Sequence, residues 1–269
     1  MTAIDSSLSI DPTPPGAKTS YDWSNFPWWL VGIVLTILFP VYKMLTDETW
    51  EDGFLFIKDG IILTFTVTTG GFVIAVIVGL VVAFARMSHR AVPRNLAMYY
   101  IEVMRGIPVL VTLFMLGLVI VPWLLNLADI DPRSMIASKA VRATVAVGLI
   151  YAAYIAEVFR AGIESVGRGQ FEAGMSLGLN KRQVFRLVVW PQAIKNVLPA
   201  LGNDLIALLK DSSLVSILAV REITQMSKLW AGSNFQFFAG FLILSAMNLT
   251  LTVSLSLALQ WYERKIATP

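Results

Sequence analysis

The sequence contains no cysteine and only one histidine, His89. Without cysteine there is no disulfide framework, no thiolate metal site and no cysteine nucleophile. His89 lies in a short basic segment, so we expect no metal site there. The chain also lacks a Gly-x-x-x-x-Gly-Lys-Ser/Thr loop, and we therefore expect it to bind no nucleotide itself. No acid, base and nucleophile assemble into a catalytic cluster, so the sequence argues against an enzyme.

Charged residues are also scarce. They make up 14% of the 269 residues, whereas apolar residues make up 56%. The apolar residues form blocks of roughly 20, the length that a helix needs to cross a bilayer. This pattern predicts an all-α integral membrane protein with about six transmembrane helices. The expected spans are about 28–45, 60–84, 96–125, 141–163, 197–220 and 237–261.

The sequence predicts three regions before and within these spans. Residues 1–27 are rich in Pro, Ser and Thr and have no signal-peptide pattern, so we expect a disordered cytoplasmic tail. Residues 28–59 are expected to form an N-terminal transmembrane helix and a periplasmic loop, and residues 60–265 to form the main membrane domain. Within the third span, Arg105-Gly106-Ile107-Pro108 should break the helix, because proline lacks a backbone donor.

The charges predict the orientation of the chain. The loop after the first span is acidic and contains Asp47, Glu48, Glu51, Asp52 and Asp59. The loops after the second and fourth spans are basic and contain Arg86, Arg90, Arg94, Arg160, Arg168, Lys181, Arg182, Arg186 and Lys195. Basic loops stay on the cytoplasmic side. We therefore expect both termini and the long loop at about 164–192 to be cytoplasmic.

Small residues recur every four positions on two spans. They are Gly71, Ala75, Gly79 and Ala83 on the second, and Gly148, Ala152 and Ala156 on the fourth. Such residues let the backbones of neighbouring helices approach closely. We expect these positions to pack and to carry no chemistry.

The long loop at about 164–192 is predicted to contain two short helices. Residues 168–177 favour a helix, Gly178 can adopt the left-handed conformation that ends it, and Asn180 can cap a second helix at 181–190. Pro191 should then stop or kink the chain. The second helix is amphipathic, as expected at a membrane surface. Physical chemistry alone leaves two alternatives open, a docking element for another protein and an ordinary solvated loop.

Polar residues within the spans are candidates for a substrate pathway, because an ionisable group at membrane depth is costly unless it faces protein or water. Glu157 and Asp204, with the adjacent Asn203, could contact substrate or form structural pairs. On the last span, Asn248 and Thr252 belong to a polar stripe with Ser245 and Ser256. This stripe could line a pathway or form hydrogen bonds between helices.

Several motifs together resemble the permease subunits of ATP-binding-cassette importers for polar amino acids, of the histidine/glutamine/arginine type. Glu172-Ala173-Gly174, followed by Gly178 and Pro191, resembles the Glu-Ala-Ala loop of that family. The same branch is suggested by Tyr100 to Pro108, Ala153 to Ile163, Leu201-Gly202-Asn203, and Leu208 to Ser216. The resemblance covers about 60–263. Three features depart from it: Gly174 in place of Ala, Ile107 in place of Thr, and the extra N-terminal span.

The resemblance implies a transport mechanism. Two permease subunits, identical or homologous, would enclose a pathway, two ATPase subunits would bind ATP and Mg beneath them, and a periplasmic or extracellular binding protein would deliver the amino acid. This chain would bind no cofactor. Glu172, Ala173, Gly174 and Gly178 would couple the permease to the ATPase, while Arg105, Pro108, Lys210 and Asp211 would have structural or gating roles.

Other transport classes stay open from the residues alone. A secondary amino-acid transporter would need no ATPase but often shows repeated halves, and no internal repeat is visible. A permease for another small solute is a further alternative.

Overall fold

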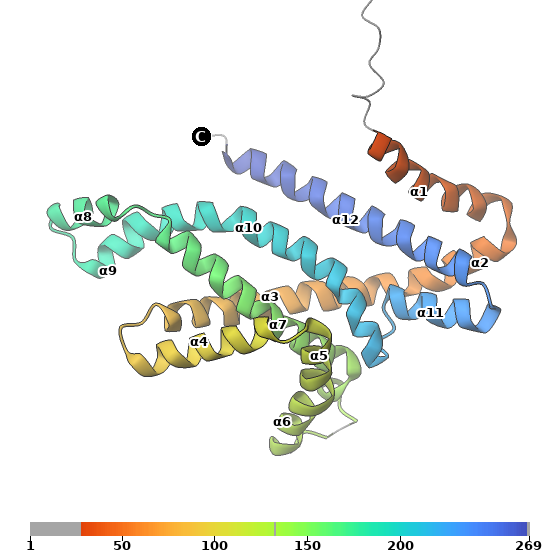
Figure 1. Cartoon of the computed structure of the whole chain (residues 1–269), viewed down its shortest axis with the longest axis horizontal. Helices are drawn as coiled ribbons and strands as arrows, with labels where there is room; N and C mark the ends of the chain where they lie inside the picture. Colours follow the sequence, from red (N-terminus) through yellow and green to blue (C-terminus); the bar gives the residue numbers. More distant parts are fainter. Residues whose placement is uncertain (1–27, 132, 268–269) are drawn as a thin grey trace, which may run out of the picture. The chain divides into compact units, whose positions relative to one another are not determined.

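The computed structural model describes residues 28–131 and 133–267, and in these residues all regular structure is helical (Figure 1). This confirms the all-α fold class. The predicted tail at 1–27 lies outside the described residues. The helices are α1 Trp28–Thr46, α2 Glu48–Ile57, α3 Ile61–Arg86, α4 Ala91–Gly106, α5 Val109–Phe114, α6 Val121–Leu127, α7 Lys139–Glu164, α8 Arg168–Ser176, α9 Lys181–Val184, α10 Trp190–Asp211, α11 Ile223–Asn234 and α12 Phe237–Ala267.

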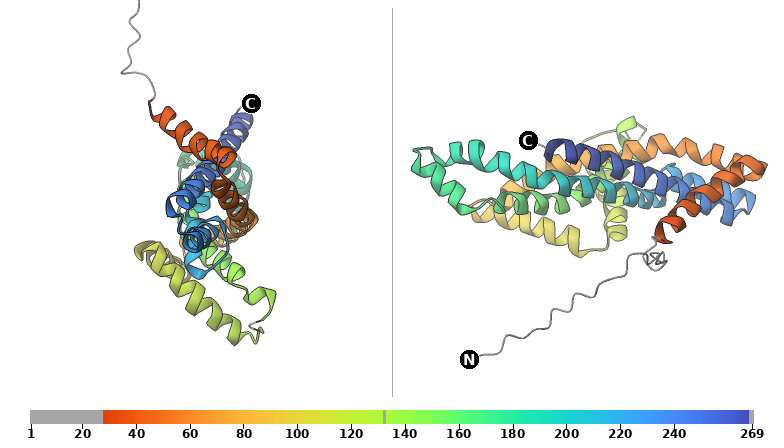
Figure 2. Two further views of the ribbon diagram at one scale, coloured as in Figure 1. Left: turned by 90° about the vertical axis from the view of Figure 1, so that its right-hand side faces the viewer. Right: turned by 90° about the horizontal axis from the view of Figure 1, so that it is seen from above.

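The chain divides into two units, Met1–Leu35 and Thr36–Pro269. In the first unit, the structure describes residues 28–35, which are the beginning of α1. The second contains the other helices, and it positions every candidate site residue. Within it, α8 and α9 lie at one end and α2 and α11 at the opposite end, with α3 and α10 running between them (Figures 1 and 2).

Helices α3 and α7 form the most extensively packed pair. Ala75 and Ala83 on α3 and Ala152 and Ala156 on α7 are fully buried, as the spacing of small residues predicted. This core extends to α4 and α10 through apolar side chains such as Ile101 and Leu208. Small residues at the contact let two backbones approach, which gives dispersion contacts that need no hydrophobic driving force.

A second core holds the opposite end of the unit together. Trp50 and Ile57 on α2 pack with Trp230 on α11 and Ile243 on α12. The Trp230 indole Nε1–H also donates to Asp52 Oδ2 across 3.0 Å, which satisfies a polar atom that would otherwise be buried without a partner.

Four helical segments in the described residues are long and apolar enough to cross a membrane. They are Glu48–Arg86, Val109–Leu127, Lys139–Glu164 and Phe237–Lys265. They correspond to the second, third, fourth and sixth predicted spans. Val31–Thr46, within the first predicted span, is a shorter apolar helix. The fifth predicted span falls on α10 and the 3₁₀ segment Ser212–Leu218.

The break predicted in the third span is present. Helix α4 ends at Gly106, Ile107 is extended, and Pro108 is the N-cap of α5. A six-residue π-helical segment, Met115–Ile120, then leads directly into α6, whose first turn contains Pro122.

The helix does not stop at Pro191, and this excludes one of the two alternatives, stop or kink, expected there. Phe185–Val189 is π-helical, and Pro191 lies in the first turn of α10. The wider π turn shifts the hydrogen-bond pattern just before the proline, so its missing N–H interrupts no regular α-helical ladder. The polypeptide therefore continues from α9 into α10, and the helix predicted at 181–190 is not a separate element.

Candidate functional site

The loop between α7 and α10 forms the helix–turn–helix expected from its sequence. Helix α8 is followed by Gly178, which has a φ of +84° in the left-handed region. The Asn180 side chain accepts from the Gln183 N–H at 3.0 Å, and the Gln183 side chain accepts from the Asn180 N–H at 2.9 Å. This reciprocal capping box fixes the start of α9, so both termini of the turn are defined by local hydrogen bonds.

Helix α8 has one face on the protein and one face outward. Phe171 packs against a small core of Ile163, Val184, Val189 and Ala193, and Gly174 is buried. Glu172 and Ala173 are exposed. The four residues predicted to couple to an ATPase differ in their exposure to solvent. Glu172 and Ala173 are available to another molecule, whereas Gly174 is not; the fourth residue is Gly178.

The burial of Gly174 explains why the residue differs from the alanine of the Glu-Ala-Ala loop. A Cβ atom on Gly174 would lie 2.9 Å from Val184 Cγ2 and 3.1 Å from Val184 Cγ1. Valine is stiff at χ1 and cannot easily turn away. Glycine at this position and valine on α9 are therefore complementary in shape, and the close packing of α8 on α9 requires the smaller residue.

Glu157 lies between two arginines at the end of the α3–α7 pair that is close to α8. Arg86 Nε is 3.2 Å from Glu157 Oε1, and Arg160 Nη2 is 2.8 Å from Glu157 Oε2. Arg160 also pairs with Glu164. The Arg86 and Glu157 side chains are 21% and 18% exposed, so this pair is mostly shielded from water. Of the two alternatives for Glu157, these contacts favour structural pairing.

Asp204 is not paired in this way. One of its carboxylate oxygens, Oδ2, is buried and has no hydrogen-bond partner among the described residues. The adjacent Asn203 is exposed on the same helix, α10. A buried polar atom without a protein partner is normally hydrogen-bonded to water or to a ligand. Asp204 therefore keeps its place as a candidate for substrate contact, and it is distinct from the paired Glu157.

Asp211 belongs to a cluster that sequence reasoning did not assemble. The Tyr151 hydroxyl donates to Asp211 Oδ2 at 2.7 Å, the Tyr151 and Tyr154 rings lie 5.8 Å apart, and Arg105 Cζ lies 5.4 Å from the Tyr154 ring centroid. The cluster joins α4, α7 and α10. The tyrosines at i and i+3 on α7 were the available signal, but their partner is 60 residues away in the chain. Lys210 is exposed and, in the described residues, forms no ion pair with Asp211.

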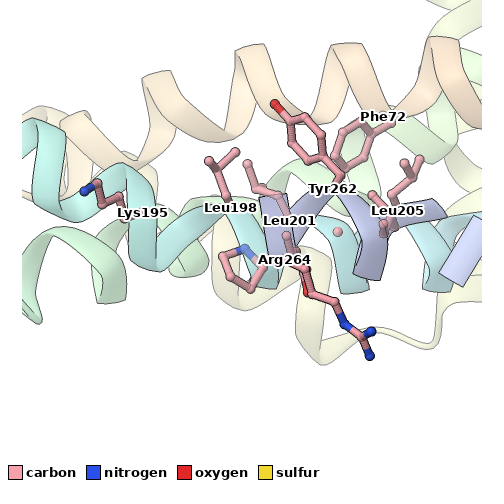
Figure 3. A pocket seen from close by; sticks show the side chains of 11 residues that line it. Phe72, Lys195, Leu198, Leu201, Leu205, Tyr262 and Arg264 are labelled. Atoms are coloured by element: carbon pink, nitrogen blue, oxygen red, sulfur yellow. The ribbon is translucent and has the colours of Figure 1, made fainter. Parts of the chain in front are cut away.

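The polar stripe on α12 forms no hydrogen bond to these groups in the described residues. Asn248 and Thr252 are half-buried, whereas Ser245 is exposed and donates to the Phe241 carbonyl oxygen on its own helix. A cavity of about 570 Å³ does open between α10 and α12, with Leu198, Leu205 and Tyr262 among its lining residues (Figure 3). The residues predicted for the pathway do not line it.

Comparisons with known proteins agree with this architecture. Residues 75–268 match the family described as binding-protein-dependent transport system inner membrane component. The chain is 33% identical over 207 residues to the probable amino-acid permease protein YxeN of Bacillus subtilis, covering 77% of this chain and 89% of that protein. It is 30% identical to the glutamate/aspartate import permease protein GltK of Escherichia coli O6:H1, covering 79% of this chain and 94% of that protein.

A solved structure shares both sequence and fold with the chain. It is a crystal structure of an amino acid ABC transporter with histidines, with a TM-score of 0.70 and 32% identity over 82% of this chain and 98% of that chain. The family match and the relatives each cover most of the chain, and the helices agree with the membrane setting. The chain is therefore a multi-pass permease subunit that belongs to the family of inner membrane components of binding-protein-dependent transport systems.

Proposed function

We propose that this permease moves polar amino acids into the cytoplasm by alternating access and that α8 is the element through which a separate ATPase drives it. The observation that carries the proposal is the geometry of α8, which exposes Glu172 and Ala173 while Phe171 and Gly174 hold it on the protein. The named relatives support an amino acid as cargo, since YxeN and GltK are both described as amino-acid permeases.

The connections of α8 supply a route for movement. Only three residues, Ser165 to Gly167, separate α7 from α8, and α9 continues through the π-helical segment into α10. A displacement of α8 by an ATPase surface would therefore act on both of these long helices. Alternating access requires such a bistable arrangement, in which ATP binding favours one state through differential contacts.

We further propose the surroundings and orientation of the subunit. Two ATPase subunits carrying ATP and Mg, a second permease, identical or homologous, and an external amino-acid-binding protein complete the importer. Both termini and α8 face the cytoplasm, in the inner membrane. The basic loops at Arg90 and Arg94 and around α8 and α9 support this orientation.

Charge reversal at Glu172 tests the coupling role. In vesicles containing the permease, its ATPase and its binding protein, Glu172→Arg should reduce amino-acid uptake per ATP hydrolysed by about tenfold or more. The reason is that an ATPase surface complementary to the Glu172 carboxylate would repel an arginine at the same position. The exposed Asp59, at the opposite end of α3, gives a control with the same change of charge, Asp59→Arg. An unchanged ratio of uptake to hydrolysis in Glu172→Arg, with the protein normally inserted, would contradict the docking role.

The proposed pathway uses Asp204 and Asn203 on α10 with Asn248 and Thr252 on α12, while Arg105, Pro108, Lys210 and Asp211 shape or gate it. Glu157 was a candidate for the same pathway, but its two arginine partners support a structural role instead. The buried, unpartnered Asp204 Oδ2 suits the amino group of a zwitterionic or cationic substrate.

Asp204→Asn should raise the KM for cationic amino acids more than for acidic ones, whereas Glu157→Gln should not change this order. Equal effects on all amino acids would count against Asp204 as a contact.

A further inference from the structure

A second cavity, of about 900 Å³, lies where α9 and the π-helical segment meet the end of α3. Its apolar wall is an aromatic cluster. The Phe84 and Trp190 rings are stacked with centroids 6.2 Å apart, and Phe185 lies 6.0 Å from each of them. Leu80 extends the wall one turn along α3. The cavity is separate from the exposed face of α8 and from the polar residues of the proposed pathway.

The rim of this cavity is basic. Arg182 and Arg186 both line it, and no carboxylate does. Both arginines are exposed, and in the described part of the chain neither forms an ion pair. The guanidinium group binds phosphate oxygens through paired donors, and it is the side chain best suited to a phosphate beside an apolar wall. The cavity therefore combines an anion-binding edge with an apolar floor.

The adjoining surface of α3 indicates what enters this floor. Ile77, Val81 and Phe84 are 60%, 64% and 42% exposed and follow one another at four- and three-residue steps, so they form one strip that leads to the cavity. The strip belongs to the membrane-spanning segment Glu48–Arg86. An apolar strip on a spanning helix contacts acyl chains, while basic residues at its end lie at headgroup depth.

We propose that this cavity binds an acidic phospholipid of the leaflet on the side of the basic loops, with the headgroup phosphate between Arg182 and Arg186 and an acyl chain along Leu80 and Phe84. The bound lipid would cover the aromatic cluster that joins α3 to the start of α10. Binding of the lipid involves neither substrate nor ATP, so it can be measured without assuming the transport function.

The absence of cysteine allows a clean test. Val81→Cys, next to the cavity but outside its lining, is labelled with a dansyl fluorophore in the full-length protein in nanodiscs. Quenching is measured with nitroxide-labelled phosphatidylglycerol or phosphatidylcholine over a range of mole fractions. We expect half-maximal quenching at a roughly tenfold lower mole fraction of phosphatidylglycerol, the size expected from two arginines near a charged lipid. The same label at Ile62→Cys, exposed near the other end of α3, should show no such preference.

Charge variants identify the source of the preference. Arg182→Gln with Arg186→Gln should reduce the difference between the two lipids to about twofold or less, whereas Arg90→Gln with Arg94→Gln, which removes the same charge from exposed positions outside the cavity, should preserve it. Equal quenching by the two lipids in labelled Val81→Cys with both arginines intact, or equal loss of the preference in both charge variants, would overturn the proposal. Absence of quenching by either lipid would show that no lipid reaches the cavity and would also overturn the proposal.

Discussion

Gly174 on α8 and Val184 on α9 are so close that a methyl group on the glycine would lie 2.9 Å from Val184 Cγ2. Val184 is fully buried, and α8 and α9 are held against each other by this contact and by the capping box of α9. The position of the exposed Glu172 therefore depends on a buried glycine two residues away.

We expect Gly174→Ala to displace α8 from α9 and to lower stability by about 1–3 kcal/mol, the cost of overpacking. Val184→Ala makes space for the added methyl group, so the double variant should be more stable than the sum of the two single changes by about 1 kcal/mol. Thermal unfolding followed by circular dichroism measures all three proteins. Strict additivity would show that the two residues do not press on each other.

Gly60 is packed directly against the backbone of another element. A Cβ atom there would lie 2.5 Å from Ile223 N and 2.6 Å from the carbonyl carbon of Glu222, both backbone atoms that no rotamer change can move. Gly60→Ala should therefore lower stability by more than about 3 kcal/mol. Gly232→Ala is the control, since nothing lies within 4 Å of its added methyl group and α11 should gain roughly 0.5–1 kcal/mol. Similar melting temperatures for the two variants would contradict this close contact.

The pairing of Glu157 predicts a coupling energy between α3 and α7. Glu157→Gln should cost about 1–3 kcal/mol, because it leaves the mostly buried Arg86 without its charged partner. A double-mutant cycle with Arg86→Met isolates the pair. Glu164→Gln removes an ion pair to Arg160 at a 54% exposed side chain and should cost less than about 0.5 kcal/mol. A coupling energy near zero would mean that the two helices are held by packing alone.

Glu222 predicts a pH dependence of stability. It is fully buried at the N-terminus of α11, where it accepts from the N–H groups of Thr224 and Gln225 at 2.8 Å. Burial raises its pKa above the ordinary 4.5, while these N–H groups and Lys228 act in the opposite direction. Because the folded-state pKa is raised, the contribution of Glu222 to stability is fully present below pH 4.5 and is lost as the pH rises through the folded-state value.

Glu222→Gln keeps an acceptor for the helix cap but cannot titrate. The difference in melting temperature between the parent protein and Glu222→Gln should therefore favour the parent most at low pH and should shift toward the variant as the pH rises above 4.5. Taking the difference removes the contribution of other carboxyl groups. A difference that is constant across this range, or that shifts toward the parent, would exclude the raised pKa.

The sequence predicted the parts of the fold that depend on local patterns. The left-handed Gly178, the cap at Asn180, the break at Pro108 and the close packing of α3 on α7 all follow from residue types and their spacing. These features need no knowledge of distant contacts. The stop that the same reasoning allowed at Pro191 is wrong, because the π-helical turn before the proline has no reliable sequence signal.

The parts that could not be predicted depend on residues far apart in the chain. Tyr151 meets Asp211 across 60 positions, and Trp230 meets Asp52 across 178. Periodicity places each residue on a face of its own helix but does not say which other helix faces it. For the same reason, the sequence left Glu157 and Asp204 equivalent, whereas the contacts with Arg86 and Arg160 distinguish them.

The α3–α7 pair is packed along its length by alanine and glycine and joined at one end through Arg86 and Glu157. At the other end, Thr64 on α3 accepts a hydrogen bond from the Ile223 N–H of α11 at 3.3 Å. Because the backbones of α3 and α7 touch along their length through residues without long side chains, we expect the two helices to move together. A displacement of both helices at the Glu157 end would therefore also move the contact between Thr64 and the backbone of α11.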